Sequence, residues 1–190
     1  MITAAQPRYL SVTDTAKIIR STLKKQFPGV KFAVRSEKYS MGASIHISWT
    51  DGPREKEVNA ITDGFEGASF DGMNDLQSYC DCWLLPDGTA QLAARPESYG
   101  GSIPEFVSDA PHPNAELVRF GSNYVFTARH ITGWEAKEEA ALNYIATHCH
   151  CDKNKFGDEW VDVLARRMVQ QAGVNETLAE TFKRVIIDRA

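Results

Sequence analysis

The chain has 190 residues, 43% of them hydrophobic and 24% charged, and a formal net charge of −4. This length suits one hydrophobic core, or a core with a small added subdomain. The composition is typical of a globular protein, and no segment approaches the roughly 18 consecutive apolar residues that span a membrane. Residues 1–8 lack the charged and apolar regions of a secretory signal, so we expect a cytoplasmic protein whose four cysteines stay reduced.

Charge is distributed unevenly along the chain. Residues 1–40 contain eight Lys or Arg against two Asp or Glu, whereas residues 41–80 contain two against seven. A basic segment in an acidic protein is suited to binding phosphates or an acidic partner surface. The same pattern is also typical of a solvated helix face, so both interpretations stay open at this point.

The N-terminal segment predicts a helix that ends at Pro28-Gly29. Ser11 and Asp14 have the spacing of a helix-capping pair, and apolar residues follow them at intervals of three and four. Four basic residues lie mostly away from this apolar stripe: Lys17, Arg20, Lys24 and Lys25.

Two strands and a second helix are predicted next. Residues 30–35 and 44–50 alternate apolar with polar residues, which indicates two neighbouring half-buried strands joined by a polar loop at 36–43. A helix at 54–65 follows, with apolar residues again at helical spacing. We expect His46 to point away from the core. Three side chains of the second strand should face the helices: Ile45, Ile47 and Trp49.

The remaining chain predicts further strands and helices. The expected segments are a loop at 65–73, strands at 79–85, 90–94 and 123–131, a long connection at 95–116, and helices at 133–149, 159–171 and 176–187. This order indicates an α+β fold, with a small antiparallel sheet flanked by helices. We expect the N-terminal α-β-β-α unit to belong to a domain at 1–132, with a helical section at 133–190 packed on it.

All four cysteines lie in two short clusters, Cys80-Asp81-Cys82 and His148-Cys149-His150-Cys151. Thiolates and imidazoles are zinc ligands, and a site of Cys80, Cys82, His148 and Cys151 is geometrically conceivable. The spacing argues against it, because Cys-x-Cys is not the Cys-x-x-Cys that wraps a tetrahedral ion. Buried small side chains are the alternative. We therefore expect no metal site and no cofactor.

The sequence predicts no catalytic residue. A cysteine nucleophile needs a histidine base close in space, and spacing along the chain does not show whether such a pair exists. The chain contains no nucleophile elbow, no phosphate-cradling glycine loop and no dinucleotide fingerprint. We therefore expect a binding protein rather than an enzyme.

A recognition surface is the remaining candidate site. Cationic and aromatic side chains together are enriched at interfaces, and they occur on the first helix and just after it. We expect Trp49 in the core rather than at this surface. The candidate binding residues are Lys17, Arg20, Lys24, Lys25, Arg35 and Lys38.

Four segments of the chain resemble a known family: Tyr9–Lys17, Pro28–Ser36, Ser44–Pro53 and Phe65–Met73. The chain resembles the large polyvalent protein-associated domain of type 29 over about residues 9–130. That domain is associated with phages, plasmids and conjugative elements. The resemblance implies a mobile-element accessory protein, and such proteins often blunt host restriction or CRISPR defences. It implies no catalytic residue, and the cysteine and histidine clusters are not part of it.

Two functions are consistent with this resemblance. The first is a non-enzymatic anti-defence protein of the anti-CRISPR or anti-restriction type, which binds a host defence protein or ribonucleoprotein effector in the host cytoplasm. The second is an accessory protein that binds nucleic acid through the basic N-terminal helix. Neither function involves a membrane.

Overall fold

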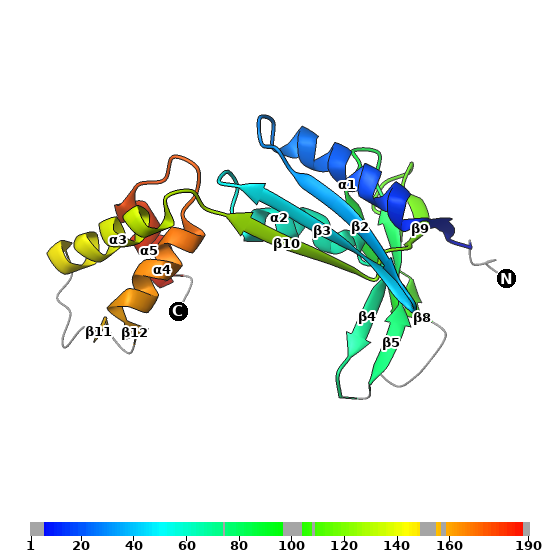
Figure 1. The fold of residues 1–190 in the computed structure, drawn as a ribbon. Coiled ribbons are helices and arrows are strands. Elements are labelled where there is room, and N and C mark those ends of the chain that lie inside the picture. The colour runs from blue at the N-terminus through cyan, green and yellow to red at the C-terminus, as the bar shows by residue number, and fades with distance from the viewer. Residues whose placement is uncertain are drawn as a thin grey trace. The chain divides into compact units, whose positions relative to one another are not determined.

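The computed structural model describes residues 6–73, 75–96, 104–107, 109–148, 155–156 and 159–187. The chain divides into two compact units, one of Met1–Trp49 with Lys56–Ala128 and one of Thr50–Glu55 with Arg129–Ala190. The first unit combines helices with several sheets, and the second is mainly helical (Figure 1). The predicted α+β fold is confirmed.

After a short strand, the first unit follows the predicted order of helix, two strands and helix. Its elements are β1 (Arg8–Leu10), α1 (Val12–Gln26), β2 (Ala33–Tyr39), β3 (Gly42–Thr50), α2 (Glu55–Thr62) and the 3-10 turn η1 (Asp63–Phe65). β2 and β3 form an antiparallel hairpin whose register runs from Ala33 opposite Ser48 to Tyr39 opposite Gly42.

The polar loop predicted at 36–43 is wrong, because most of these residues continue the hairpin. Ser36 pairs with Ile45 and Lys38 with Ala43, so only a tight turn separates the strands. The polar residues of β2 are exposed and suit a strand here, since an antiparallel sheet can leave side chains in water. The polar residues at 36–39 therefore belong to an exposed strand and not to a loop.

Seven more strands complete the sheets: β4 (Ala68–Asp71), β5 (Leu76–Tyr79), β6 (Asp81–Leu84), β7 (Ala90–Pro96), β8 (Pro104–Val107), β9 (Glu116–Phe120) and β10 (Tyr124–His130). One sheet has the order β1-β9-β6-β7-β8, a second has the order β10-β3-β2, and β4 pairs with β5 alone. The pairing of β1 with β9 is parallel, while the hairpins are antiparallel.

Several of these strands were not predicted. The loop expected at 65–73 contains β4, and the long connection expected at 95–116 contains β8 and the first residue of β9. β1 and β5 were also missed. Strands of three to five residues carry too few alternating positions to be recognised without their pairing partners.

The core of the first unit lies between α1 and the hairpin. Ile45, Ile47 and Trp49 are at most 2% exposed, as predicted, and they pack with Ile19 and Leu23 of α1. His46 alternates with them and is exposed, also as predicted. Period-two alternation along β3 therefore fixes which face of the sheet α1 covers.

The second unit has its own core among three helices. Its elements are α3 (Trp134–His148), β11 (Lys155–Phe156), β12 (Glu159–Trp160), α4 (Val161–Gln171) and α5 (Leu178–Ile187). Ala141 and Ile145 of α3 pack with Leu164 and Met168 of α4 and with Val185 of α5. None of the helices in the described residues is long and apolar enough to cross a membrane.

Candidate functional site

Helix α1 carries most of the predicted binding residues, and its sequence accounts for both of its ends. The Ser11 hydroxyl accepts a hydrogen bond from the Asp14 backbone N–H at 3.2 Å, which caps the N-terminus as predicted. Lys24 and Lys25 lie in the last turn, where a positive charge suits the negative end of the helix dipole.

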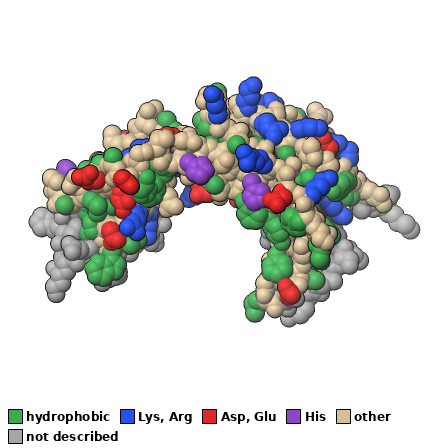
Figure 2. Space-filling model, viewed as in Figure 1, with side chains coloured by type: hydrophobic (Ala, Val, Ile, Leu, Met, Phe, Trp, Pro, Cys, Tyr) green, Lys and Arg blue, Asp and Glu red, His purple; other side chains and the backbone are tan. Residues whose placement is uncertain are grey.

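The four basic residues of α1 share its solvent face. Lys17, Arg20 and Lys24 follow each other at intervals of three and four, and Lys25 is adjacent to Lys24, so all four lie opposite the buried stripe. All four are exposed. Figure 2 shows Lys and Arg side chains gathered along the side of the molecule where α1 lies.

These four side chains differ in their partners. Lys17 forms an ion pair with Asp14 at 2.8 Å, and the hydrogen bond from Lys17 is the main reason that the pKa of Asp14 is lowered. Arg20 donates to the Val34 backbone oxygen at 2.8 Å, which ties α1 to β2. Within the described part of the chain, Lys24 and Lys25 form no ion pair, although the charge of Lys25 contributes to the lowered pKa of Asp87. Lys24 is therefore the one of the four for which the described residues supply neither a hydrogen-bond acceptor nor a neighbouring carboxylate.

The two predicted residues on β2 point to opposite faces of the hairpin. Arg35 pairs with His46, which is exposed, whereas Lys38 pairs with Ala43, which is buried on the side of α1. Residues an odd number of positions apart on a strand always face opposite ways. The structure therefore groups Lys38 with the side that α1 covers, and it places Arg35 on the other side of the sheet.

Lys38 is also separate from the last turn of α1. It lies beside Val12, the first residue of the helix. Lys24 follows Val12 by twelve positions along the helix, which corresponds to about 18 Å along the axis. The six predicted binding residues thus occupy three places: the solvent face of α1, the side of the hairpin near the start of α1, and the opposite face of the sheet.

The open face of the β10-β3-β2 sheet has an aromatic cluster, of which Tyr124 and Phe126 were not predicted as binding residues. The His46 ring lies 5.2 Å from the ring of Phe126, which in turn lies 6.2 Å from Tyr124. Glu37 approaches His46 at 3.6 Å. Tyr124 and Phe126 are two positions apart on β10, so the sequence predicts that they share a face. That this face also holds His46 follows only from the pairing of β10 with β3.

The cysteines of the described residues are buried rather than assembled with other ligands. Cys80 and Cys82 are 3% and 1% exposed, and neither forms a disulfide. Burial is the main cause that raises the pKa of the Cys82 thiol to about 12. Since the thiolate is the nucleophile and the metal ligand, Cys82 is poorly suited to either role at neutral pH.

The histidine cluster is only partly described. The His148 ring stacks on Tyr144 with 4.3 Å between ring centroids, and its Nδ1 lies 3.0 Å from the Tyr144 backbone oxygen. Cys149, His150 and Cys151 lie outside the described residues. Among the residues that the structure describes, no three His, Cys, Asp or Glu side chains are grouped so that they could hold a metal ion.

Fold and site together define an α+β protein with four exposed basic residues on one face of its N-terminal helix. Residues 10–132 match the family described as large polyvalent protein associated domain 29. Because this match spans more than half of the chain, the protein belongs to that family, as the sequence predicted. The family connects the chain with phage-associated polyvalent proteins. No curated protein and no solved structure matches the chain.

Proposed function

We propose that this protein is a mobile-element accessory protein that protects invading DNA by binding a host defence effector. It works in the host cytoplasm, by occupying a surface of the effector and without catalysing a reaction. Its family membership supports the link to mobile elements. The effector is a protein or ribonucleoprotein complex with an acidic surface, which the basic face of α1 contacts.

One observation carries this proposal. Lys24 and Lys25 are exposed, and neither is within ion-pair distance of a carboxylate in the described part of the chain. Arg20 stands next to them and, among the described residues, donates to a backbone oxygen rather than to a carboxylate. A positive surface whose lysines form no ion pairs, on a protein of net charge −4, favours one orientation toward an acidic partner and speeds association. The remainder of the protein repels that partner, so contact is directed to α1.

The test is a double charge reversal at the last turn of α1. Lys24→Glu with Lys25→Glu should lower protection of a phage or plasmid in a host with an active defence system by at least about tenfold. Both side chains are exposed, so the melting temperature should stay near that of the parent.

A matched control changes the net charge by the same amount elsewhere. Lys56→Glu with Lys183→Glu reverses two exposed lysines, one on α2 and one on α5, and should leave protection unchanged. If the α1 double variant is folded and protects as well as the parent, the basic face is not the interface.

The same basic face favours a second candidate, an accessory protein that binds nucleic acid. Phosphate contacts release counterions, so affinity for a duplex would fall steeply with rising salt, whereas a shape-complementary protein interface responds mildly. Titrating purified protein with duplex DNA at two salt concentrations separates the candidates. Measurable binding at low salt that the Lys24/Lys25 reversal abolishes would favour the nucleic-acid function.

A further inference from the structure

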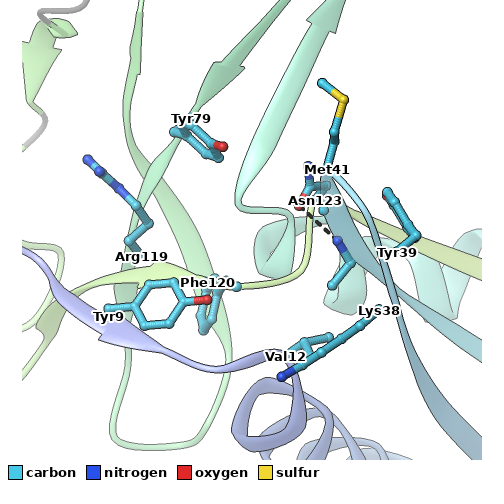
Figure 3. A pocket seen from close by; sticks show the side chains of 12 residues that line it. Tyr9, Val12, Lys38, Tyr39, Met41, Tyr79, Arg119, Phe120 and Asn123 are labelled. Atoms are coloured by element: carbon cyan, nitrogen blue, oxygen red, sulfur yellow. Dashed lines mark hydrogen bonds between the residues drawn. The ribbon is translucent and has the colours of Figure 1, made fainter.

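A pocket of about 640 Å³ lies at the end of the first unit where the β2–β3 hairpin turns. Its wall is formed by β1, the start of α1, the hairpin, β5 and the segment around the end of β9 (Figure 3). Small-molecule sites typically have volumes of roughly 300–1,000 Å³, so this pocket is large enough for a small organic ligand. Of the six residues predicted to bind a partner, Lys38 is the one among the described lining residues of this pocket.

Aromatic side chains dominate the accessible wall. Tyr9, Tyr39 and Tyr79 line the pocket from three different strands, and they are 67%, 48% and 60% exposed. Figure 3 shows Tyr9 and Tyr79 on the same side of the pocket and Tyr39 across from them. Exposed aromatic faces of this kind stack on planar rings such as nucleic-acid bases.

Asn123 supplies a directed polar group in the wall of the pocket. It is 7% exposed, and its Oδ1 accepts a hydrogen bond from the Ala43 N–H at 3.3 Å. That bond fixes the orientation of the amide, and Nδ2 has no acceptor among the described residues. A Cβ at position 42 would lie 2.7 Å from Nδ2, so only Gly42 leaves the amide room. The Nδ2 group therefore remains available as a hydrogen-bond donor toward a ligand.

The charges around the pocket favour an anion. Lys38 forms no ion pair within the described residues, and none of the described residues that line the pocket is Asp or Glu. Arg119 also lines it, but its Nε donates to Asp81 at 2.7 Å, which compensates its charge. The N-terminus of α1 beside Val12 is already capped by Ser11 and carries the Asp14 carboxylate, so it adds no free positive charge. Lys38 is thus the main cation available to a ligand.

We propose that this pocket binds a nucleotide unit, with the base against the tyrosines and the phosphate at Lys38. The Asn123 amide then donates to an acceptor on the edge of the base. An anion without a ring would leave the tyrosines unused, and an uncharged ring would leave Lys38 unused. The unit is either a free nucleotide or one residue of a single strand, because both present the same base and phosphate. This site is distinct from the effector interface proposed on the last turn of α1.

Calorimetric titration of the full chain tests the proposal with defined probes. Adenosine 5′-monophosphate and a single-stranded tetranucleotide should bind with dissociation constants below about 1 mM, and adenosine and inorganic phosphate should each bind more weakly. A tetranucleotide that binds at least about tenfold tighter than the mononucleotide identifies a strand as the ligand, and similar affinities identify a free nucleotide. The proposal is overturned if neither nucleotide binds, if phosphate alone binds as tightly, or if an acidic peptide binds more tightly.

Two exposed substitutions separate the base from the phosphate. Lys38→Gln should weaken mononucleotide binding about tenfold and leave adenosine binding unchanged, whereas Tyr79→Leu should weaken both. Lys31→Gln, an exposed change outside the pocket lining, is the matched control and should alter neither affinity. Equal affinities for the parent and the Lys38 variant would overturn the phosphate assignment. The Lys24→Glu and Lys25→Glu double variant should bind the mononucleotide as tightly as the parent, because neither residue lines the pocket, so this proposal and the effector proposal can fail independently.

Discussion

At the level of single residues, Glu176 shows most clearly how one side chain joins elements of the second unit. Its two carboxylate oxygens accept from the Arg184 Nε and Nη2, each at 2.9 Å, and from the Gly173 N–H at 2.7 Å. These bonds connect the segment after α4 to α5. The hydrogen bonds from Arg184 are the largest cause that lowers the pKa of Glu176 from 4.5 to about 2.

We predict that Glu176 makes the second unit sensitive to acid. Its folded pKa is below its unfolded value, so its contribution is present above pH 4.5 and is lost as the pH falls toward about 2. Glu176→Gln should therefore lower the stability at pH 7 by on the order of 2 kcal/mol and have little effect near pH 2. Denaturant unfolding of both proteins at each pH measures this difference.

Glu139→Gln serves as the control, because Glu139 is exposed on α3 and forms no ion pair within the described residues. It should change stability by less than about 0.5 kcal/mol. A deficit in the Glu176 variant that is the same at pH 7 and at pH 2 would contradict the assigned carboxylate role.

At the level of elements, the β2–β3 hairpin and α1 show how one pattern organises the first unit. Alternate residues of β3 lie on one face, which is buried and packs against α1: Ala43, Ile45, Ile47 and Trp49. The same alternation decides that Arg35 and Lys38 face opposite ways. Element geometry therefore controls both the core and the division of the basic residues between surfaces.

We predict that adjacent positions of β3 respond very differently to the same substitution. Ile47→Asn places an amide where the native side chain is 1% exposed, so the free energy of unfolding should fall by about 3 kcal/mol or more. His46→Asn changes the exposed face and should cost less than about 1 kcal/mol. Thermal unfolding of both variants measures the contrast, and equal melting temperatures would show that the two faces are assigned incorrectly.

At the level of the whole molecule, the cysteine clusters belong to different units. Cys80 and Cys82 belong to the first unit, and His148 belongs to the second. Cys82 is directed to the Glu66 backbone oxygen at 3.8 Å, which is a weak thiol hydrogen bond within its own unit. Cys80 and Cys82 are thus buried side chains of the first unit.

We predict that the purified protein contains no stoichiometric zinc. The ligand spacings are poor for a closed tetrahedral site, and Cys82 lies among apolar neighbours in the core of the first unit. Elemental analysis after purification without chelator should find well under one zinc per chain. About one zinc per chain, removed by chelation together with a drop in melting temperature, would reverse this prediction.

The sequence by itself determined those features of the protein that depend on neighbours along the chain. Helical spacing and the Ser11 cap predicted α1, and alternation predicted the buried face of β3. The family was also recognisable from residues alone, and the match over 10–132 confirms it.

Only the tertiary structure decided the pairing of short strands and the grouping of distant residues. β1 consists of three residues that pair with β9, more than a hundred positions later, and no local pattern specifies such a partner. Tyr9, Tyr79 and Asn123 meet at one pocket for the same reason. The orientation of Arg35 and Lys38 depends on both. Strand periodicity makes them face opposite ways, but only the structure shows that the strand extends to Tyr39. Local interactions act within a few residues, whereas sheet pairing joins segments whose proximity depends on the whole fold.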